Sequence, residues 1–357
     1  MKILFVISAL GKGGAERVLQ VLANHFVKDH EIKILKFDSD EPFYEFSPKI
    51  KIKNLNLGVE DKGFFGNIKK RFGKIFALRN ELKNSDADIV ISFLDNTNIL
   101  TLIANFGIGK KIIITEHINY NFLQGFWRVL RRLTYPFADG LTVLTKYDYE
   151  RYPYVKNRTI MPNPMFEIPE ISGFKKENLI LSAGRLIPHK DFKTFLKALN
   201  LVDSKLLKGW KIVIAGDGTE RENLQNLANE LNLNIDFVGF VSNLHEYYAK
   251  AKIIVVTSTQ EGFCNILMES IYFDIARIST DCIAGPSELI ESGKDGFLCE
   301  VGDEKGVAEK LEILMRDENL QDEFIKNANL RRDDFLAENI CKKWLEFINS
   351  TLEKNNL

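Results

Sequence analysis

The chain has 357 residues, of which 45% are hydrophobic and 27% are charged, and its formal net charge is −1. This length exceeds the roughly 250–300 residues that one hydrophobic core usually supports, so two domains are expected. A net charge near zero, with no nucleic-acid-binding motif, argues against a nucleic-acid partner. The sequence also contains no apolar run of the roughly 18 residues needed to span a bilayer.

The charges are divided unequally along the chain. Residues 1–160 contain 25 Lys and Arg against 17 Asp and Glu, whereas residues 161–357 contain 23 against 32. A basic first half predicts a surface that meets an anionic partner, either a membrane or a phosphate group.

The N-terminus and the cysteines indicate the compartment. The apolar run at residues 3–7 is followed by Gly-Lys-Gly-Gly rather than by a small-residue cleavage site, so we interpret it as the first buried strand and not as a signal peptide. The cysteines form no CxxC pair and no zinc spacing, which predicts reduced thiols in a cytoplasmic protein without a metal site. They are Cys264, Cys282, Cys299 and Cys341.

Apolar, strand-like runs alternate with helical segments along the whole chain. In the first half these runs lie at residues 3–9, 31–37, 89–93, 112–115 and 141–144. The pattern restarts after the proline-rich segment 161–169, with runs at residues 179–182, 211–215, 235–237, 253–256 and 276–279. Continuous apolar strands between helices are typical of parallel sheets covered on both faces. The predicted fold class is therefore α/β, with two Rossmann-like parallel-sheet domains at 1–165 and 170–336.

A basic segment between the second and third of these runs has helical spacing. Its cations alternate with Phe72, Ile75, Phe76 and Leu78. Such a helix can lie on an anionic membrane surface or hold a lipid-linked pyrophosphate, and a solvated face over the core is the alternative. The candidate cations are Lys69, Lys70, Arg71, Lys74 and Arg79. Residues 127–132, Trp-Arg-Val-Leu-Arg-Arg, form a second candidate patch.

A glycine-rich turn follows the first apolar run. Gly13 and Gly14 lie in Gly-Lys-Gly-Gly-Ala-Glu-Arg, residues 11–17. Glycine lets the backbone approach a ligand closely, and the amides of a following helix favour phosphate. A dinucleotide fingerprint would need glycine where the chain has Glu16, so an NAD-dependent dehydrogenase is disfavoured.

Two glutamates stand eight positions apart in the second half, directly after the run at 253–256. Glu261 and Glu269 enclose the sequence Glu-Gly-Phe-Cys-Asn-Ile-Leu-Met-Glu. The first carboxylate is expected on a loop at the carboxyl end of a strand, where open α/β sheets bind ligands. The second falls in the first turns of a helix. A carboxylate accepts hydrogen bonds from both hydroxyls of a ribose, so Glu269 fits a ribose and Glu261 a sugar.

This run resembles the paired-glutamate motif of the retaining nucleotide-sugar glycosyltransferases of family 4, and Gly-Gly-Ala-Glu-Arg resembles a signature of the same family. The resemblance implies the GT-B architecture, in which two Rossmann-like domains face each other across a cleft. It further implies that the first domain binds the acceptor, that the second binds the nucleotide sugar, and that the final helix, 337–357, packs back on the first domain.

The resemblance also assigns roles to individual residues. Arg185 and Lys190 correspond to the family's two cations, which stabilise the departing nucleoside diphosphate. A guanidinium can hold two phosphate oxygens, and an ammonium supplies a point charge. His117, which follows the run at 112–115, resembles the histidine that contacts the transferred sugar. The catalytic candidates are Arg185, Lys190, His117 and Glu261.

Further residues are expected to bind substrate. Glu288 lies in Gly-Pro-Ser-Glu, which resembles a loop common in the family's second domain, and the alternative role of this loop is a turn and helix cap. The substrate-binding candidates are Gly13, Gly14, Glu269, Gly262, Phe263, Cys264, Asn265 and Glu288.

Residues 91–98 and 269–273 are similar to bacterial family members that extend undecaprenyl-diphosphate-linked oligosaccharides for protein N-glycosylation. The resemblance implies transfer of N-acetylgalactosamine from a UDP-sugar to a polyprenyl-diphosphate-linked glycan, in one or several additions. It implies front-face retaining transfer, in which a donor phosphate oxygen takes the acceptor proton, without a cofactor or a metal. The expected location is cytoplasmic, peripheral on the anionic inner face of the cell membrane.

Three alternatives remain open from the sequence. The chain could transfer another hexose or N-acetylhexosamine in lipopolysaccharide or capsule synthesis. It could be a nucleotide-sugar 2-epimerase of the same architecture, or a non-catalytic sugar-nucleotide sensor. Donor turnover with and without a lipid-linked acceptor separates the epimerase and the sensor from a transferase.

Overall fold

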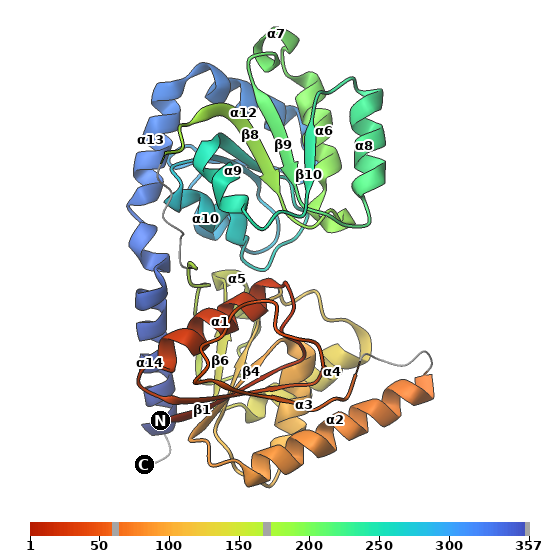
Figure 1. Cartoon of the computed structure of the whole chain (residues 1–357), viewed down its shortest axis with the longest axis vertical. Coiled ribbons are helices and arrows are strands. Elements are labelled where there is room, and N and C mark those ends of the chain that lie inside the picture. The colour runs from red at the N-terminus through yellow and green to blue at the C-terminus, as the bar shows by residue number, and fades with distance from the viewer. Residues whose placement is uncertain (59–63, 167–172, 354–357) are drawn as a thin grey trace. The chain divides into compact units, whose positions relative to one another are not determined.

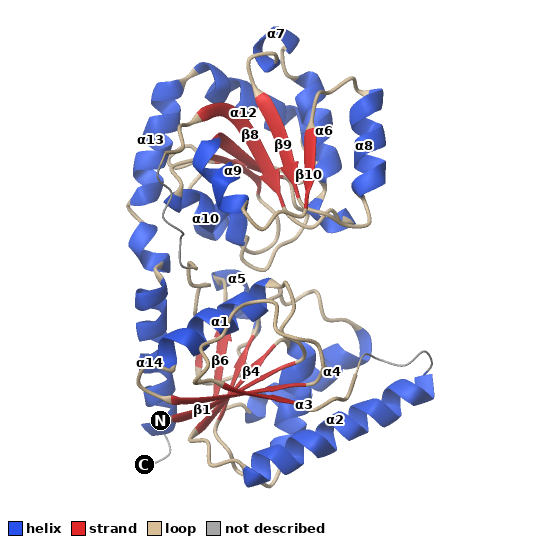
Figure 2. Ribbon diagram, in the orientation of Figure 1, coloured by secondary structure: helices blue, strands red, loops and turns tan. Residues whose placement is uncertain are grey.

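The computed structural model describes residues 1–58, 64–166 and 173–353, and the side chains of 64–69 are not described. It divides into two compact units: a first unit of Met1–Phe166 with Leu336–Leu357, and a second unit of Glu167–Phe335. Each unit is a parallel β-sheet with helices on both faces (Figure 1, Figure 2). The predicted fold class, two Rossmann-like parallel-sheet domains, is confirmed.

The first unit contains a seven-stranded sheet in the order β3-β2-β1-β4-β5-β6-β7, with every neighbouring pair parallel. Its strands are β1 (Lys2–Ile7), β2 (Glu31–Lys36), β3 (Lys51–Asn54), β4 (Ile89–Phe93), β5 (Ile112–Thr115), β6 (Gly140–Val143) and β7 (Arg158–Ile160). The central strands β4, β5 and β6 are buried along their whole length, which is why they read as continuous apolar runs.

Helices cover both faces of this sheet. One hydrophobic core joins the sheet to α1 and α14, and the other joins it to α2 and α3. Trp344 and Ile348 of α14 are fully buried in the first of these cores. The helices are α1 (Gly14–Phe26), α2 (Phe64–Asn84), α3 (Asp95–Asn105), α4 (Gly125–Thr134), η1 (Tyr135–Phe137), α5 (Lys146–Arg151) and α14 (Ala337–Glu353).

The second unit contains a six-stranded sheet in the order β10-β9-β8-β11-β12-β13, again parallel throughout. Its strands are β8 (Glu177–Ala183), β9 (Lys211–Ala215), β10 (Asp236–Gly239), β11 (Ala251–Val256), β12 (Ala276–Thr280) and β13 (Phe297–Cys299). Its helices are η2 (Pro188–Lys190), α6 (Phe192–Leu201), α7 (Ser204–Leu207), α8 (Arg221–Glu230), α9 (Leu244–Lys250), α10 (Asn265–Tyr272), α11 (Pro286–Leu289), α12 (Glu304–Arg316), α13 (Glu318–Asn329) and η3 (Arg332–Phe335).

Strand order reverses once in each sheet, between β1 and β4 in the first unit and between β8 and β11 in the second. Open α/β sheets bind ligands at the carboxyl ends of the strands at this switch point. The loops after β1, β4, β8 and β11 are therefore the places where a ligand site is expected. Among the residues that the structure describes, no helix has both the length and the hydrophobicity that crossing a membrane requires.

Candidate active site

An enclosed charged pair of the second unit lies at the switch point of its sheet. Lys190 ends η2 in the loop after β8, and Glu261 lies in the loop after β11. The Lys190 Nζ is 2.6 Å from the Glu261 Oε1, and the hydroxyl of Ser258 donates to the same oxygen at 2.6 Å. The side chains of Lys190 and Glu261 are only 18% and 8% exposed. The fold thus brings together Lys190, which the sequence analysis assigned to the diphosphate of a nucleotide sugar, and Glu261, which it assigned to the sugar.

Both members of this pair are held in place by their loops. Burial alone would lower the pKa of Lys190, but the charge and hydrogen bond of the Glu261 carboxylate outweigh it and raise the pKa, so the ammonium stays charged. The hydroxyl of Thr257 donates to the Asp191 carbonyl at 2.9 Å, and the amide of Thr259 donates to the His189 carbonyl at 2.8 Å. These bonds join the loop after β8 to the loop after β11.

Arg185 lies in the same loop as Lys190, but its side chain is exposed. It follows Gly184, whose amide donates to the Ala215 carbonyl at 2.9 Å and so fixes the start of the loop beside β9. The loop therefore presents one enclosed ammonium and one accessible guanidinium at the switch point of this sheet.

Glu269 is a buried carboxylate on α10 and is 4% exposed. The hydroxyl of Tyr248, on α9, donates to the Glu269 Oε2 at 2.8 Å. Tyr248 is itself buried and packs against Phe273, with ring centroids 5.1 Å apart. The sequence predicted Glu269 but not Tyr248, because no motif connects residues on these two helices.

Residues between the two glutamates form the turn that starts α10. Phe263 is buried and meets Phe335 edge to face at 6.0 Å, whereas Gly262 and Asn265 are half-buried. Cys264 is the N-cap of α10 and has φ +68°, a left-handed conformation that costs about 1–2 kcal/mol for a residue with a Cβ. Burial, together with the charge of Glu261, raises the pKa of the Cys264 thiol, so it remains a neutral thiol.

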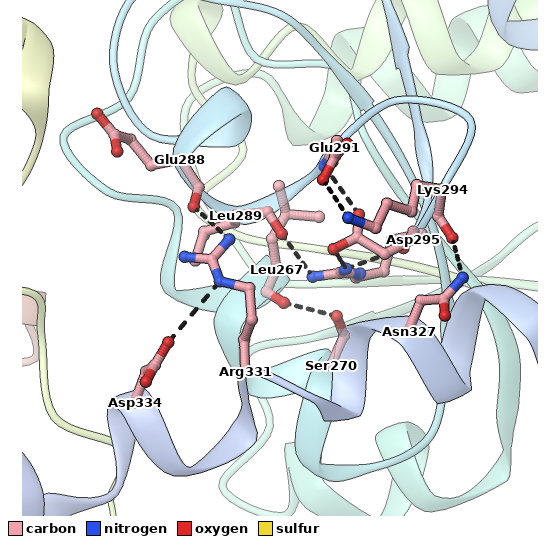
Figure 3. Close-up of polar contacts among 11 residues, drawn as sticks. Leu267, Ser270, Glu288, Leu289, Glu291, Lys294, Asp295, Asn327, Arg331 and Asp334 are labelled. Atoms are coloured by element: carbon pink, nitrogen blue, oxygen red, sulfur yellow. Dashed lines mark hydrogen bonds and ion pairs between the residues drawn. The ribbon is translucent and has the colours of Figure 1, made fainter.

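A buried ion pair holds the loop that carries Glu288. The guanidinium of Arg277, on β12, donates to the Leu289 carbonyl at 3.0 Å and to the Asp295 carbonyl at 2.8 Å. It also lies 3.2 Å from the Asp295 carboxylate, with both side chains almost completely buried. Arg331 donates to the Glu288 carbonyl at 2.9 Å. In Figure 3 the Glu288 carboxylate points away from this network, so only its backbone belongs to it.

The same loop needs a glycine at position 285. Gly285 has φ +104°, and a Cβ there would lie 2.9 Å from the backbone of Phe263. The loop after β12 therefore packs directly on the turn between the two glutamates. The sequence missed Arg277 and Asp295 because they stand 18 positions apart and no motif connects them.

His117 lies directly after β5 in the first unit. Its ring stacks on Phe93, with centroids 5.2 Å apart and planes 8° apart, and its Nε2 is 3.0 Å from the Thr115 hydroxyl. Burial lowers the pKa of His117 to about 4, so the imidazole is neutral at pH 7. It can offer a hydrogen bond to a ligand without adding charge.

A buried polar cluster lies behind His117. The hydroxyl of Tyr135 donates to the Glu116 carboxyl, and Asn98 donates to the Thr115 carbonyl at 2.8 Å. Burial, and then the nearby Asp95, raise the pKa of Glu116 to about 8. Glu116 is therefore protonated at neutral pH, and its neighbours hold the end of β5 from which His117 projects.

This cluster predicts a pH dependence of stability. The folded chain keeps the Glu116 proton that the unfolded chain releases above its ordinary pKa of 4.5. The stabilisation is fully present below that value and is lost as the pH rises through about 8. Glu116→Gln keeps the shape but cannot ionise, so its unfolding free energy should fall less than that of the wild type between about pH 5 and about pH 9.

Urea denaturation of both proteins across this range measures the difference. Burial also raises the pKa values of Asp95 and Asp148. Both residues are present in both proteins, so their contributions to the pH dependence cancel in the comparison. If the unfolding free energies of the two proteins change equally with pH, Glu116 does not carry this proton.

The glycine-rich turn begins α1. Gly13 is its N-cap and Gly14 its first residue. A Cβ at position 13 would lie 2.0 Å from a carboxylate oxygen of Glu16, so glycine makes room for that carboxylate. Glu16 therefore already places negative charge at the amino terminus of α1, where the sequence predicted that amides would face a phosphate.

Three of the candidate cations of α2 contact neighbouring parts of the first unit. The guanidinium of Arg71 lies over the Trp127 ring at 4.9 Å, and the ammonium of Lys74 lies over the Phe37 ring at 5.2 Å. Arg79 donates to the carbonyls of Ala104 and Phe106 at 3.0 and 2.6 Å.

Of the two remaining candidate cations, only Lys70 has a described side chain. Lys70 is half-buried, and the side chain of Lys69 lies outside the described residues. Phe72 and Phe76 are instead exposed, at 69% and 77%. Arg71, Lys74 and Arg79 therefore lie along the protein, and Phe72 and Phe76 are the exposed side chains between them.

The described residues contain no group of three or more His, Cys, Asp or Glu that could hold a metal ion. All four cysteines are buried free thiols.

Comparisons with known proteins agree with this architecture. Residues 12–154 match the family model "Glycosyltransferase Family 4", and residues 165–331 match "Glycosyl transferases group 1". The structure resembles that of Anabaena Alr3699/HepE in complex with UDP, with a TM-score of 0.79, 17% identity, and coverage of 98% of this chain and 100% of that one. That likeness shows the GT-B fold.

Two curated relatives come from Campylobacter jejuni. The first, 42% identical over 98% of both chains, is the "GalNAc-alpha-(1->4)-GalNAc-alpha-(1->3)-diNAcBac-PP-undecaprenol alpha-1,4-N-acetyl-D-galactosaminyltransferase". The second, 27% identical over 96% of this chain and 98% of its own, is the "N-acetylgalactosamine-N,N'-diacetylbacillosaminyl-diphospho-undecaprenol 4-alpha-N-acetylgalactosaminyltransferase". Similarity of this extent, together with the matching family models, shows that the chain belongs to the retaining glycosyltransferases of family 4.

Proposed function

We propose that this enzyme transfers N-acetylgalactosamine from UDP-N-acetylgalactosamine to an undecaprenyl-diphosphate-linked oligosaccharide, in one or several successive additions. The observation that carries this proposal is the 42% identity, over 98% of both chains, to a Campylobacter jejuni enzyme that acts on such an acceptor. A relative at 27% identity has an acceptor of the same class, which supports the same assignment.

The donor binds the second unit in this proposal. Arg185 and Lys190 hold its diphosphate, and Glu269 accepts hydrogen bonds from the ribose hydroxyls. Glu261 and the backbone of Gly262, Phe263, Cys264 and Asn265 face the sugar, and Glu288 closes the site. The enclosed Lys190 supports this assignment because an ammonium already desolvated by the protein interacts strongly with a developing phosphate charge.

The proposed reaction is front-face transfer with retention. The bond between the sugar C1 and the UDP oxygen breaks, and the acceptor hydroxyl oxygen bonds to C1 from the same face. Its proton passes to a phosphate oxygen of the leaving UDP. Lys190 and Arg185 supply the positive charge that balances this oxygen, so we propose that no metal or other cofactor takes part. Neutral His117 donates a hydrogen bond to a sugar hydroxyl.

The contact between Tyr248 and Glu269 predicts a donor-affinity effect. Tyr248→Phe removes the hydroxyl that orients the buried carboxylate, and a hydrogen bond to a charged group is worth about 1.5–3 kcal/mol. The KM for the UDP-sugar should rise roughly tenfold or more, with a smaller change in kcat. Tyr247→Phe, on the neighbouring half-buried residue, is the matched control and should leave the KM unchanged.

The acceptor binds the first unit in this proposal, near Gly13, Gly14 and His117. The α2 cations, from Lys69 to Arg79, are candidates for its diphosphate. Lys74 supports this role because its ammonium lies over Phe37, directly after β2, at the carboxyl edge of the sheet. A lipid-linked acceptor requires contact with a membrane, so we propose a peripheral enzyme on the cytoplasmic face of the cell membrane.

A panel of donors tests this function. The enzyme is incubated with UDP- and GDP-sugars, each with a short lipid-diphosphate oligosaccharide, and product mass and the anomeric configuration of the new bond are determined. Gain of N-acetylhexosamine in the α configuration from UDP-N-acetylgalactosamine supports the proposal. Growth only from another hexose assigns a different transferase, and isomerised donor without product assigns the 2-epimerase.

A further inference from the structure

Helix α4 turns an apolar stripe outward, although its inner side chains Trp127 and Leu130 also pack against the hydrophobic core. Its one buried residue is Arg131, and its outward residues include Phe126, Val129 and Leu133, which are 66%, 57% and 60% exposed. These three positions follow the i, i+3, i+7 spacing of a single stripe. An amphipathic helix normally turns such a stripe toward the core.

Arg131 holds the helix in this orientation. Its guanidinium donates to the Tyr120 carbonyl at 2.9 Å and to the Tyr152 hydroxyl at 3.2 Å, and it lies over the Tyr120 ring at 4.0 Å. Rolling α4 to bury its apolar stripe would break these bonds and expose a buried network. The outward stripe is therefore built into the structure.

The stripe continues onto neighbouring elements. Phe137 of η1 and Phe106 after α3 are 70% and 76% exposed, and they border a groove of about 740 Å³ that Arg79 and Ile108 also line. Arg71 over the Trp127 ring brings α2, with the exposed Phe72 and Phe76, beside α4. Figure 1 shows α2, α3 and α4 side by side on one side of the sheet. The α4 face consists of Phe72, Phe76, Phe106, Phe126, Val129, Leu133 and Phe137.

Cations flank this apolar face. Arg128 and Arg132 are exposed on α4, one turn apart, and lie about 100° around the helix from the stripe. Their guanidinium groups lie 5.9 Å from the Tyr120 ring and 3.9 Å from the Tyr154 ring. A helix with an outward apolar stripe and flanking arginines matches the interface of an anionic bilayer, with apolar side chains among the acyl chains and cations among the headgroups.

We propose that the α4 face is the surface that binds an anionic lipid bilayer, with α4 lying in the interface plane. This inference deepens the proposed function and rests on its membrane-linked acceptor. The occupant is the bilayer and not a second copy of the chain, because the apolar side chains are bordered by cations that anionic headgroups would neutralise. The α2 cations then remain available to the acceptor and are not the main membrane contact.

Helix α4 is connected to the loop that carries His117. Tyr120, whose carbonyl Arg131 holds, lies three residues after His117, and its amide donates to the Asp148 carboxylate at 2.8 Å. Because the loop between β5 and α4 is fixed at this point, binding of α4 to the bilayer sets the position of His117 relative to the lipid headgroups. Arg131 is therefore a positioning residue for the acceptor site.

The test is co-sedimentation of the full chain with vesicles of phosphatidylcholine, with and without phosphatidylglycerol. The triple variant Phe126→Ser, Val129→Ser, Leu133→Ser should bind the anionic vesicles at least about tenfold more weakly than the wild type. The matched control is Leu201→Ser, Ile313→Ser, Leu330→Ser, which removes three exposed apolar side chains of the second unit and should bind like the wild type. The double variant Arg128→Ser, Arg132→Ser should lose the preference for phosphatidylglycerol.

Unchanged vesicle binding by the α4 triple variant, with unchanged melting temperature, would overturn the proposal. So would a concentration-dependent dimer that the same variant dissociates, because a second copy would then cover the face. Activity separates this inference from the proposed function: the triple variant should keep its rate on a water-soluble short-chain acceptor and lose rate on a vesicle-embedded one. Absence of transfer by the wild type to either acceptor would contradict the proposed function and leave the vesicle result standing.

Discussion

Replacing Lys190 with alanine is expected to lower kcat for sugar transfer by about a hundredfold or more. The enclosed ammonium, 18% exposed and 2.6 Å from Glu261, is preorganised beside the proposed diphosphate position. Loss of one preorganised electrostatic donor costs about 10²–10³ in rate. Arg185→Ala is expected to have an effect of the same order, because the guanidinium shares the developing charge. Steady-state kinetics with saturating donor measures both.

Lys193→Ala is the matched control for Lys190→Ala. Lys193 is an exposed lysine three residues further along, on α6, and its removal should leave kcat unchanged. A Lys190→Ala enzyme with turnover within a few fold of the wild type would remove this cation from the leaving-group role. Lys190→Arg, which keeps the charge but not the geometry, should recover only part of the rate.

Asp295→Ala is expected to destabilise the second unit by about 3–5 kcal/mol, because it leaves the Arg277 guanidinium buried without its counter-charge. Both side chains are almost fully buried, and burial already lowers the pKa of Arg277 to about 10. The effect is measured as the free energy of unfolding in urea. The loop around Glu288 should also become less ordered, because the same guanidinium donates a hydrogen bond to the Leu289 carbonyl.

Two variants control this result. Glu291→Ala removes the exposed partner of Lys294 on the same loop and should not change stability measurably. The double variant Arg277→Met, Asp295→Leu removes both charges and should recover much of the lost stability. Equal destabilisation by Asp295→Ala and by the double variant would mean that packing, and not the unpaired charge, dominates.

The sequence predicted the fold class and most central strands because buried parallel strands are continuous apolar runs. β4, β5 and β9 begin and end where those runs do. It missed β3, β7 and β13, the short strands at or near the sheet edges. β3 reads Lys-Ile-Lys-Asn and β7 reads Arg-Thr-Ile, with no residue of either strand fully buried. Half-exposed strands of three or four residues carry too weak a pattern to be distinguished from loops.

The family and the positions of the paired glutamates could also be predicted, because both depend on local motifs. The contact between Lys190 and Glu261 could not, since it joins residues 71 positions apart through the strand order of the sheet. The Arg277 network was missed for the same reason. The basic patch at 127–132 was predicted, but its orientation was not: periodicity alone does not reveal that Arg131 is inside and Val129 outside.

The most direct test of the central claim is the coupling of UDP release to acceptor growth. The enzyme is incubated with UDP-N-acetylgalactosamine alone and with increasing undecaprenyl-diphosphate-linked oligosaccharide, and released UDP and product mass are followed together. We expect one UDP for each N-acetylhexosamine added, with release dependent on the acceptor. UDP release at the same rate without acceptor growth would contradict the assignment of this enzyme as a lipid-linked-oligosaccharide N-acetylgalactosaminyltransferase.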